Sequence, residues 1–530
     1  MVWLKKNKFL ALLVALFLAQ FFFISPLGEF PLNDDWVHAE MAQHWAETGS
    51  FRLNPFTGPL LYTQLIYGAG LIKVFGFSFT LLRFSTLAIT ASLVFGIWYF
   101  LKNQTKNEPL AFLGALLIWL NPLVYTLSFT FMSDIPALAF LFLGIISFLQ
   151  GSNKNKVIWF WFGAISTVAG FFIRQTVILL LPAAGLLTLL KPSLRKIKYF
   201  IAIIIPGLVA VVIYYWLQNN QLLGEGTGFH DIKSKKELIK HALWWTVYTS
   251  LYLGLFLLPL TVNFIKKINL KLHLFFGLFG LAFTTFLYFY KQKLFPYVPN
   301  TITPEGLGPM TDTLSGLYLP LFPHWVWLLV SGLAGLGLGF LLANLWLILK
   351  NNKFYTSPHI IIINFSLIFC GPILLFTGFD RYFIPLILTG TLLLILENPH
   401  TKPSPLAWLI ILVMSFYTLS QTQFYLNWNR AKAELVTVAI TKYGAEINTL
   451  DAGYEWTGYY GYWQSAQIPK VYRWPVGSPW WIRFLMINNN RQQVISSSPE
   501  KNYSIIEQRS VRGLNPNNKL YLLQRNDGQK

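Results

Sequence analysis

The sequence is poor in charge, in acidic residues and in cysteine, and each shortage excludes a class of protein. Only 12% of the 530 residues are charged, against about 25% in an average soluble domain. Aromatic residues make up 17% of the chain, too many for a disordered protein. The one cysteine, Cys370, excludes a disulfide framework and a cysteine-based metal site.

Apolar runs of membrane-spanning length recur along most of the chain. The first follows Lys5, Lys6 and Lys8 and is not followed by a small-residue cleavage site, so we expect a retained signal anchor. The expected fold is an all-α polytopic membrane protein with about 13 transmembrane helices. These spans are expected at roughly residues 9–24, 79–101, 110–128, 135–150, 157–173, 175–190, 198–217, 244–265, 272–290, 322–349, 359–376, 382–396 and 405–420.

The net charge of +20 is unevenly distributed between the two sides that this topology defines. With the N-terminus inside, the cytoplasmic segments hold 17 basic residues and only two acidic ones, Glu108 and Glu397. Such an excess of Lys and Arg is typical of the cytoplasmic side of a membrane protein. We therefore expect a multi-pass protein of the plasma (inner) membrane with a cytoplasmic N-terminus, which contacts membrane lipids and no nucleic acid.

The last segment, residues 424–530, is polar, and an odd number of spans places it on the outer side. Apolar spacing predicts a helix over 431–443. We expect a small extracytoplasmic α/β domain here, after a transmembrane domain of residues 1–423. Its strands are expected near 447–450, 493–497, 503–507 and 520–523.

The first outer loop, about residues 25–78, carries an adjacent pair of acids, Asp34 and Asp35. Two amphipathic stretches follow, one ending at Trp45 and one from Gln64 to Phe75, and we expect both to be interfacial helices. Asn33 or Asp34 would be an ordinary cap for the helix beginning at Trp36. A cap needs only one such residue, so capping and a functional role both remain open.

Three further polar groups lie at the outer ends of spans: Asp134, Arg174-Gln175 and Asp380-Arg381. Each has a structural explanation, namely a helix cap before Pro136, a snorkelling arginine and a local ion pair. All of them nevertheless fall at the same membrane face as the first loop. Because charged groups at membrane depth are costly and usually mark a site, a shared face favours a single polar site.

The order of these motifs resembles glycosyltransferase superfamily C, in particular the bacterial branch related to dolichyl-phosphate-mannose–protein mannosyltransferases and the lipid A aminoarabinose transferase. The resemblance covers most of the chain, and the order and topology of the motifs carry it. The matching pieces are Asn33-Asp34-Asp35-Trp36, Met132-Ser133-Asp134-Ile135-Pro136, Ile173-Arg174-Gln175-Thr176, Gly306-Leu307-Gly308-Pro309, Asp380-Arg381-Tyr382, Trp428-Asn429-Arg430-Ala431 and Asp451-Ala452-Gly453-Tyr454-Glu455-Trp456.

The resemblance implies inverting transfer of a hexose or pentose from a polyprenyl-phosphate-linked donor to an acceptor hydroxyl at the outer face. A carboxylate of the first loop would be the general base, and the sequence does not choose between Asp34 and Asp35. Arg174 is the first candidate to stabilise the leaving phosphate. The further candidates for substrate binding are Arg381, Lys293, Gln175, Asp134 and Asp380.

No cofactor is required by this chemistry, although Asp34, Asp35 and Asp134 have the hard oxygen ligands that suit Mg²⁺ or Mn²⁺. The outer segments 218–243, with the glycine-rich run 224–228, and 291–321 are expected to shape the substrate site. Aromatic residues between Tyr454 and Trp463 would either stack on sugars or anchor the outer domain.

Two other functions are compatible with a multi-pass protein. A transporter or lipid flippase predicts related halves and helices broken at mid-membrane, and the sequence has no such symmetry. A non-catalytic scaffold leaves the clustered acids unexplained. The acceptor, whether a lipid, a glycan or a protein, is not identified by the sequence.

Overall fold

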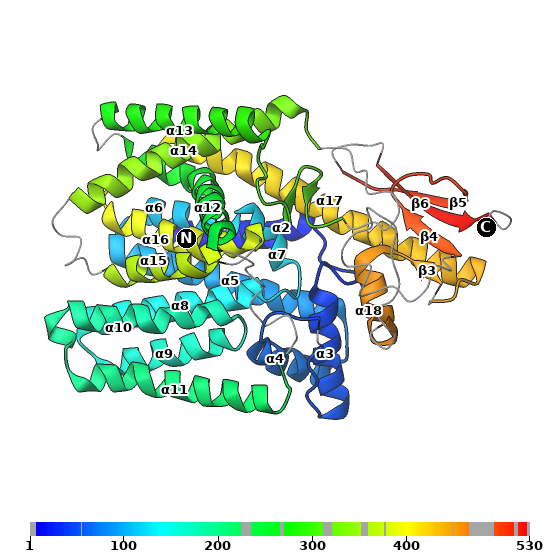
Figure 1. Ribbon diagram of the computed structural model, residues 1–530, viewed down its shortest axis with the longest axis horizontal. Coiled ribbons are helices and arrows are strands. Elements are labelled where there is room, and N and C mark those ends of the chain that lie inside the picture. The colour runs from blue at the N-terminus through cyan, green and yellow to red at the C-terminus, as the bar shows by residue number, and fades with distance from the viewer. Residues whose placement is uncertain are drawn as a thin grey trace.

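A body of packed helices carries a small sheet at one end (Figure 1). The computed structural model describes residues 7–54, 56–223, 235–265, 270–310, 321–350, 359–375, 378–447, 449–465, 492–513 and 518–526. The expected glycine-rich run at 224–228 lies outside these residues. The helices are α2 (Lys8–Phe23), α3 (Asp35–Thr48), α4 (Tyr62–Phe75), α5 (Phe79–Thr105), α6 (Glu108–Trp119), α7 (Pro122–Ser128), α8 (Asp134–Lys154), α9 (Val157–Phe171), α10 (Leu180–Leu190), α11 (Ile197–Asn219), α12 (Lys235–Asn263), α13 (Leu270–Lys291), α14 (His324–Lys350), α15 (Ile360–Leu375), α16 (Ile384–Glu397), α17 (Pro405–Tyr443) and α18 (Gly453–Ser465), with 3-10 helices η1 (Gln175–Leu179), η2 (Pro192–Leu194) and η6 (Asp380–Phe383).

Every expected span coincides with a helix, but the number thirteen is not confirmed. Within the described residues seven helices are long and apolar enough to cross a membrane, or eight if one bent pair is a single span. The others are short: α2 and α15 have 16 residues each, about 24 Å at 1.5 Å per residue. A hydrocarbon core of about 30 Å exceeds that length.

The bent pair is α6 and α7, which the sequence analysis treated as one span over 110–128. Pro122 stands in the first turn of α7 and the Asn121 side chain accepts a hydrogen bond from Leu123 N. Proline and a capping residue together start a new helix. The two axes therefore meet at 65°.

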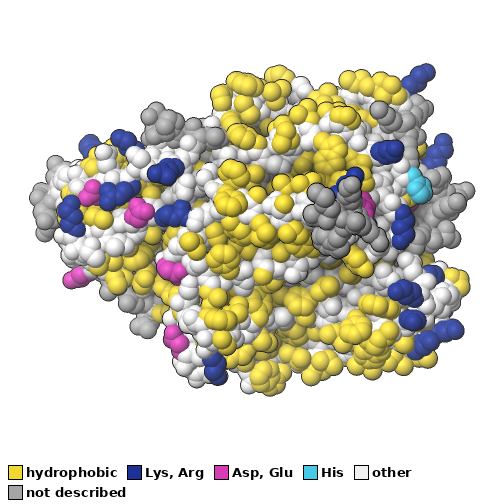
Figure 2. All heavy atoms as spheres, turned by 180° about the vertical axis from the view of Figure 1, so that it is seen from behind, with side chains coloured by type: hydrophobic (Ala, Val, Ile, Leu, Met, Phe, Trp, Pro, Cys, Tyr) yellow, Lys and Arg dark blue, Asp and Glu magenta, His cyan; other side chains and the backbone are white. Residues whose placement is uncertain are grey.

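Apolar side chains cover the helical body, as expected for a protein in lipid. Figure 2 shows its middle as almost wholly hydrophobic, with Lys and Arg gathered at the end farthest from the sheet and on the sheet domain itself. Phe289 of α13 and Val212 of α11, for example, are 76% and 67% exposed. In water such a surface would cause aggregation. Together with the helices of spanning length, it indicates that the chain is a membrane protein.

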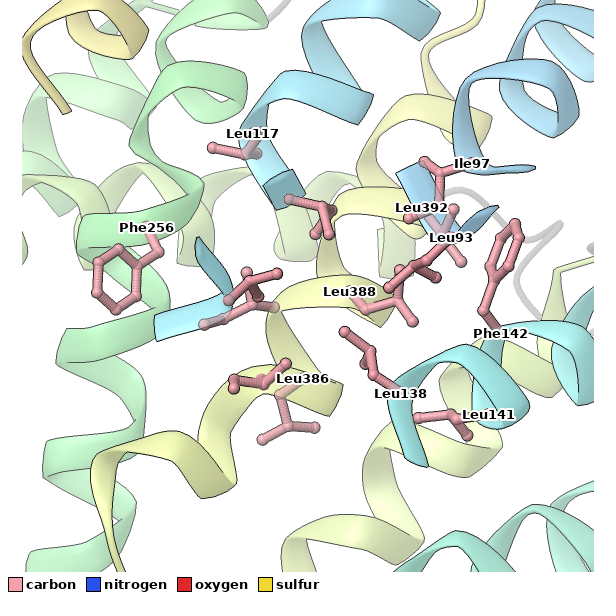
Figure 3. Packing of buried hydrophobic residues seen from close by; sticks show 14 of the residues in the cluster. Leu93, Ile97, Leu117, Leu138, Leu141, Phe142, Phe256, Leu386, Leu388 and Leu392 are labelled. Carbon is pink, nitrogen blue, oxygen red and sulfur yellow. The ribbon is translucent and has the colours of Figure 1, made fainter. Parts of the chain in front are cut away.

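The core of the body is built around α16, which is buried on nearly every side. Figure 3 shows Leu388 and Leu392 of α16 among Leu93 and Ile97 of α5 and Leu138 of α8. This burial explains why α16, with only 14 residues, is apolar apart from Thr389, Thr391 and the terminal Glu397. It also fixes the position of η6, which directly precedes it.

The C-terminal sheet has the order β3-β4-β6-β5. Its strands are β3 (Leu450–Asp451), β4 (Gln493–Ser496), β5 (Tyr503–Ser510) and β6 (Lys519–Arg525), with β3 parallel to β4 and the other pairs antiparallel. All four lie near the expected strands. The expected α/β domain as a unit stays a prediction, because residues 466–491 lie outside the described residues.

The helix expected over 431–443 is not a separate element. It is the second half of α17, which continues from Pro405 to Tyr443 without a break. The expected domain boundary at 423/424 therefore falls inside a helix. A second small feature is the hairpin of β1 (Ile302–Thr303) and β2 (Gly306–Leu307), which turns at Pro304-Glu305, so the first two residues of the glycine motif form a strand.

Candidate active site

Asp35, the second acid of the adjacent pair, links two backbone segments through its carboxylate. It is the first residue of α3 and only 2% exposed. Its Oδ1 accepts a hydrogen bond from Leu32 N at 2.6 Å, and its Oδ2 accepts one from Phe131 N at 3.2 Å. Both oxygens therefore bind main-chain N–H groups, one in its own loop and one just before α8.

The Phe131 peptide joins the first loop to the beginning of α8. Besides donating to Asp35, it accepts hydrogen bonds at its carbonyl from His38 Nδ1 at 3.0 Å and Gln64 Nε2 at 2.7 Å. A carbonyl only accepts, so His38 carries its proton on Nδ1. Helices α3 and α4 are thus tied to the segment that leads into Asp134.

Asp34 has a different environment from its neighbour. It precedes α3, but its side chain makes no capping hydrogen bond. Arg381 Nη2 donates to its Oδ2 at 3.0 Å, and the Tyr454 hydroxyl donates to its Oδ1 at 2.5 Å. The Asp34 side chain is 29% exposed. It is therefore a reachable carboxylate held by two side chains from distant parts of the chain.

Tyr454 is a site residue whose role the sequence did not indicate. It lies in the first turn of α18, and its ring packs edge-on against Trp36, with centroids 6.2 Å apart. A Cβ added at Gly458, one turn later, would lie 2.5 Å from the Trp36 ring, so only glycine permits this close contact. The sequence placed Tyr454 among aromatic residues for stacking or anchoring, and it contained no signal for a partner 420 residues away.

A cavity of about 240 Å³ lies at the N-terminal ends of α8 and α16; Asp34 does not line it, but its partner Arg381 does. One part is polar and is lined by Asp134, Arg174, Gln175 and Arg381. Asp134 and Arg174 form an ion pair. The apolar walls include Leu138, Leu141, Phe365, Phe369, Ile373 and Ile384.

Arg381 connects this cavity to Asp34. It is 6% exposed, and within the described parts of the chain its Nε and Nη1 have no hydrogen-bond partner. A buried donor left without a partner costs about 1–3 kcal/mol, and more if charged. Arg381 therefore retains two donors for a further acceptor while its Nη2 remains on Asp34.

Electrostatics separates the two adjacent acids. Burial would raise the pKa of Asp34, but the charge of Arg381 and the hydrogen bonds from Tyr454 and Arg381 outweigh it and hold that pKa below its usual value. Burial raises the pKa of Asp35 to about 7, against the opposing effect of its backbone hydrogen bonds. Burial lowers the pKa of His38 to about 4, so the imidazole is neutral near pH 7.

Three other expected site residues have distinct positions. Gln175 lines the cavity and donates through Nε2 to the Gly58 carbonyl at 2.9 Å. Asp380 is fully buried and accepts hydrogen bonds from the N–H groups of Thr301 and Ile302, so it anchors the β1–β2 hairpin beside the site. Lys293 does not line this cavity; its ammonium lies 5.5 Å from the centre of the Tyr248 ring.

The three acids considered as metal ligands do not converge. Asp34 binds Arg381 and Tyr454, Asp35 binds two peptide groups, and Asp134 pairs with Arg174. Throughout the described ranges, no three His, Cys, Asp or Glu side chains come together in an arrangement that would hold a metal ion. This donor set does not fit a divalent ion, and metal independence stays a prediction.

Known proteins share features with this chain. Residues 63–216, from α4 to α11, match the family model of dolichyl-phosphate-mannose-protein mannosyltransferase. ArnT from Cupriavidus metallidurans bound to undecaprenyl phosphate is similar at 12% identity and a TM-score of 0.43, over 82% of this chain and 73% of that one. Apo ArnT from the same organism has the same identity and TM-score, and the match covers 99% of this chain and 100% of that one. An oligosaccharyltransferase from Archaeoglobus fulgidus, tethered with an acceptor peptide, is similar at 12% identity and a TM-score of 0.31. The match covers 79% of this chain and 56% of that one. No curated protein matches the chain.

The family match confirms the resemblance drawn from the motifs, over less than a third of the chain. It includes Asp134, Arg174 and Gln175, whereas Asp34 and Arg381 lie outside it. Together with the helices of spanning length, it indicates a membrane protein that is similar to glycosyltransferases over residues 63–216.

Proposed function

We propose that this protein transfers a sugar from a polyprenyl-phosphate donor to an acceptor hydroxyl, with inversion, at the outer face of the plasma membrane. The observation that carries the proposal is the continuity of three parts: an apolar cavity, two arginines at its polar part, and an accessible carboxylate bound to one of them. Such a cavity complements a lipid phosphate, because the tail requires apolar walls and the phosphate requires cationic donors.

The donor phosphate would bind between Arg174 and Arg381. Arg174 is already paired with Asp134, which fixes its orientation, and its guanidinium stacks on the Tyr382 ring at 4.9 Å. Arg381 contributes the donors that have no other partner in the described residues. A polyprenyl phosphate is a good leaving group once its growing negative charge is stabilised, so these two cations replace a strong general acid.

Asp34 is the general base in this proposal, rather than Asp35. The low pKa of Asp34 keeps it ionised, and its partly exposed side chain can meet an acceptor hydroxyl. The acceptor oxygen bonds to the anomeric carbon while the bond from that carbon to the phosphate oxygen breaks. The hydroxyl proton passes to Asp34 and the electron pair leaves with the phosphate. Asp35 has both oxygens committed to the backbone.

The position of the cavity argues against the alternative of a transporter or flippase. Its walls come from the first turns of α8, the last turns of α15 and the first residues of α16, so it lies at one end of these helices. A transport site is expected near mid-membrane, between related halves. A site at one end suits an enzyme that takes a donor from the bilayer and an acceptor from one side of it.

Complementation tests this proposal in a strain that lacks the protein. That strain should accumulate a polyprenyl-phosphate sugar, and wild-type protein should remove it. Asp34→Asn should leave the donor at the level of the deletion, and Arg381→Gln should do the same because phosphate binding is lost. Lipid extracts analysed by mass spectrometry would identify the donor sugar in the same experiment.

The matched control is Glu47→Gln, an exposed acid of the same helix α3, which should restore the wild-type lipid profile. Protein levels in membranes must be equal among the variants. Full complementation by Asp34→Asn would reject its role as base. Absence of any accumulated polyprenyl-phosphate sugar in the deletion strain would reject the donor class.

A further inference from the structure

A second cavity lies between α17 and α18, separate from the proposed donor cavity (Figure 1 shows both helices). Its volume is about 310 Å³, within the range of roughly 300–1000 Å³ that is usual for small-molecule sites. Asn429 and Lys432 of α17 lie on one side, and Glu455, Trp456 and Tyr460 of α18 on the other. Residues 29–31 of the first loop close one end.

Two polar groups of this cavity have no partner among the residues that the structure describes. Asn429 is 1% exposed; its Nδ2 donates to the Tyr425 carbonyl, but its Oδ1 accepts nothing. The Trp456 indole N–H is also buried and donates to nothing in the described chain. The two residues that line the cavity therefore hold one acceptor and one donor without a partner, and a ligand that can both donate and accept would satisfy both.

The charged groups of the cavity already have partners within the protein. Lys432 Nζ donates to Glu455 Oε2 at 2.8 Å, and both side chains are more than nine-tenths buried. The carboxylate of Glu29 accepts hydrogen bonds from Ser78 Oγ and Phe79 N, each at 2.8 Å. The one remaining charge is the negative charge of Glu29, so no unpaired cation is left to attract a phosphate or a carboxylate.

Aromatic rings make up the walls on the α18 side. The rings of Trp456 and Tyr460, one turn apart, have centroids 4.1 Å apart, and those of Tyr459 and Tyr460 are 4.9 Å apart. Flat aromatic faces pack well against the C–H faces of a sugar ring, while tryptophan N–H and amide oxygens bind its hydroxyls. A purely apolar ligand would leave Asn429 and Trp456 without partners.

We infer that this cavity binds one neutral carbohydrate unit. Neutral hydroxyl groups both donate and accept, which satisfies Asn429 Oδ1 and Trp456 Nε1 together, and a ring of hexose size matches the aromatic walls. The inference does not depend on the proposed transfer reaction, because it is a statement about binding alone. If the bound sugar is part of an acceptor, α18 carries both this cavity and Tyr454, which binds Asp34.

Saturation-transfer NMR on the full-length protein in lipid nanodiscs tests the inference. The probes are a panel of neutral hexose and N-acetylhexosamine disaccharides, with glucose 6-phosphate as the charged comparison. Asn429→Leu and Trp456→Ala should each weaken neutral binding about tenfold, the equivalent of 1.4 kcal/mol. Trp456→Phe, which keeps a ring but removes the N–H group, should give a smaller loss.

The matched controls are Asn427→Leu on the same helix α17 and Tyr521→Ala on β6, neither of which lines the cavity. Both should bind the neutral probes as the wild type does. Thermal stability and gel filtration of each variant show whether it is folded. The inference is overturned if the wild type binds none of the neutral probes, if it prefers glucose 6-phosphate, or if both cavity variants bind normally.

Discussion

At the residue scale, the adjacent residues Asp34 and Asp35 have different partners: Asp34 binds side chains and Asp35 binds backbone N–H groups. Successive residues at the start of a helix point about 100° apart, so Asp35 turns toward Leu32 and Phe131 while Asp34 meets Arg381 and Tyr454. The sequence predicted an acidic pair but could not divide the roles, because the difference lies entirely in partners supplied by other segments.

Tyr454→Phe tests whether the Tyr454 hydroxyl tunes the base. Removing a hydrogen bond to the charged form raises the pKa of Asp34, so the acid side of the pH–rate profile should shift to higher pH. Hydrogen bonds to charged groups are worth roughly 1.5–3 kcal/mol, so the rate below that pKa should fall at least about tenfold. The rate is measured as release of polyprenyl phosphate from the donor between pH 4 and 9.

Tyr459→Phe is the control for this experiment, because its hydroxyl lies on the same helix but donates to Gln43 Oε1 at 3.0 Å. Its pH–rate profile should coincide with that of the wild type. An unshifted acid limb in Tyr454→Phe would mean that the hydroxyl only helps to hold the two segments together.

Asp35→Asn should make the stability of the protein less sensitive to pH. The pKa of Asp35 in the folded protein is about 7, above the ordinary value of about 3.9. The stability that comes from its protonated form is therefore complete below about pH 4 and is lost as the pH rises to 7. Asparagine mimics the protonated form at every pH. The variant should therefore become more stable relative to the wild type as the pH rises from 5 to 8.

Thermal melting of both proteins in detergent at several pH values measures this difference, and the other titrating groups cancel in the comparison. The charged neighbours that influence Asp35 are Arg83 and Glu455. A constant difference in Tm across this pH range would show that Asp35 keeps an ordinary pKa.

At the element scale, α17 shows where sequence patterns mislead. Residues 405–420 read as a span and 431–443 as a separate helix, because the composition of the chain changes from apolar to polar near residue 424. The backbone hydrogen bonds of a helix do not depend on which solvent surrounds it, and no Gly or Pro interrupts residues 406–443. One helix of 39 residues therefore joins the membrane body to the sheet. The apolar helices were predictable from uninterrupted apolar runs, although the number that cross the membrane was not. The strands and both helices of the first loop were predictable from their patterns of apolar residues.

The contact between α18 and α3 is testable at Gly458. Helix propensity alone would make Gly458→Ala stabilising by about 1 kcal/mol. The added Cβ would instead meet the buried Trp36 ring at 2.5 Å and push α18 away from Asp34. We therefore expect a lower Tm and a loss of donor turnover. Thr457→Ala, whose hydroxyl lacks a partner among the described residues, should leave both unchanged; an active, stable Gly458→Ala would contradict the packing.

At the scale of the whole molecule, the candidate site has contributions from three distant parts of the chain. Asp34 belongs to the first loop, Arg381 to η6 and Tyr454 to α18. From the sequence, the topology indicated that Asp34, Arg174 and Arg381 share one face, which was enough to group them. It could not indicate which pairs touch, because hydrogen-bond partners hundreds of residues apart leave no periodic signal.

Cysteine labelling tests the topology behind the proposal. The chain has a single native cysteine, so Cys370→Ser provides a background without thiols. Glu446→Cys, after α17, should react with a membrane-impermeant maleimide in intact cells. Lys106→Cys, between α5 and α6, should react only after the membrane is opened. The opposite pattern would place the proposed site on the cytoplasmic side.

The hydrogen bond between Tyr454 and Asp34 has a consequence for the timing of biosynthesis. Its two residues are 420 positions apart, and a ribosome adds about 5–20 residues per second, so roughly 20–80 s separate the two during translation. Throughout that interval the first loop exists while α18 does not. The candidate active site is therefore completed only when the last fifth of the protein has been synthesised, and a partly made chain has no finished catalytic centre.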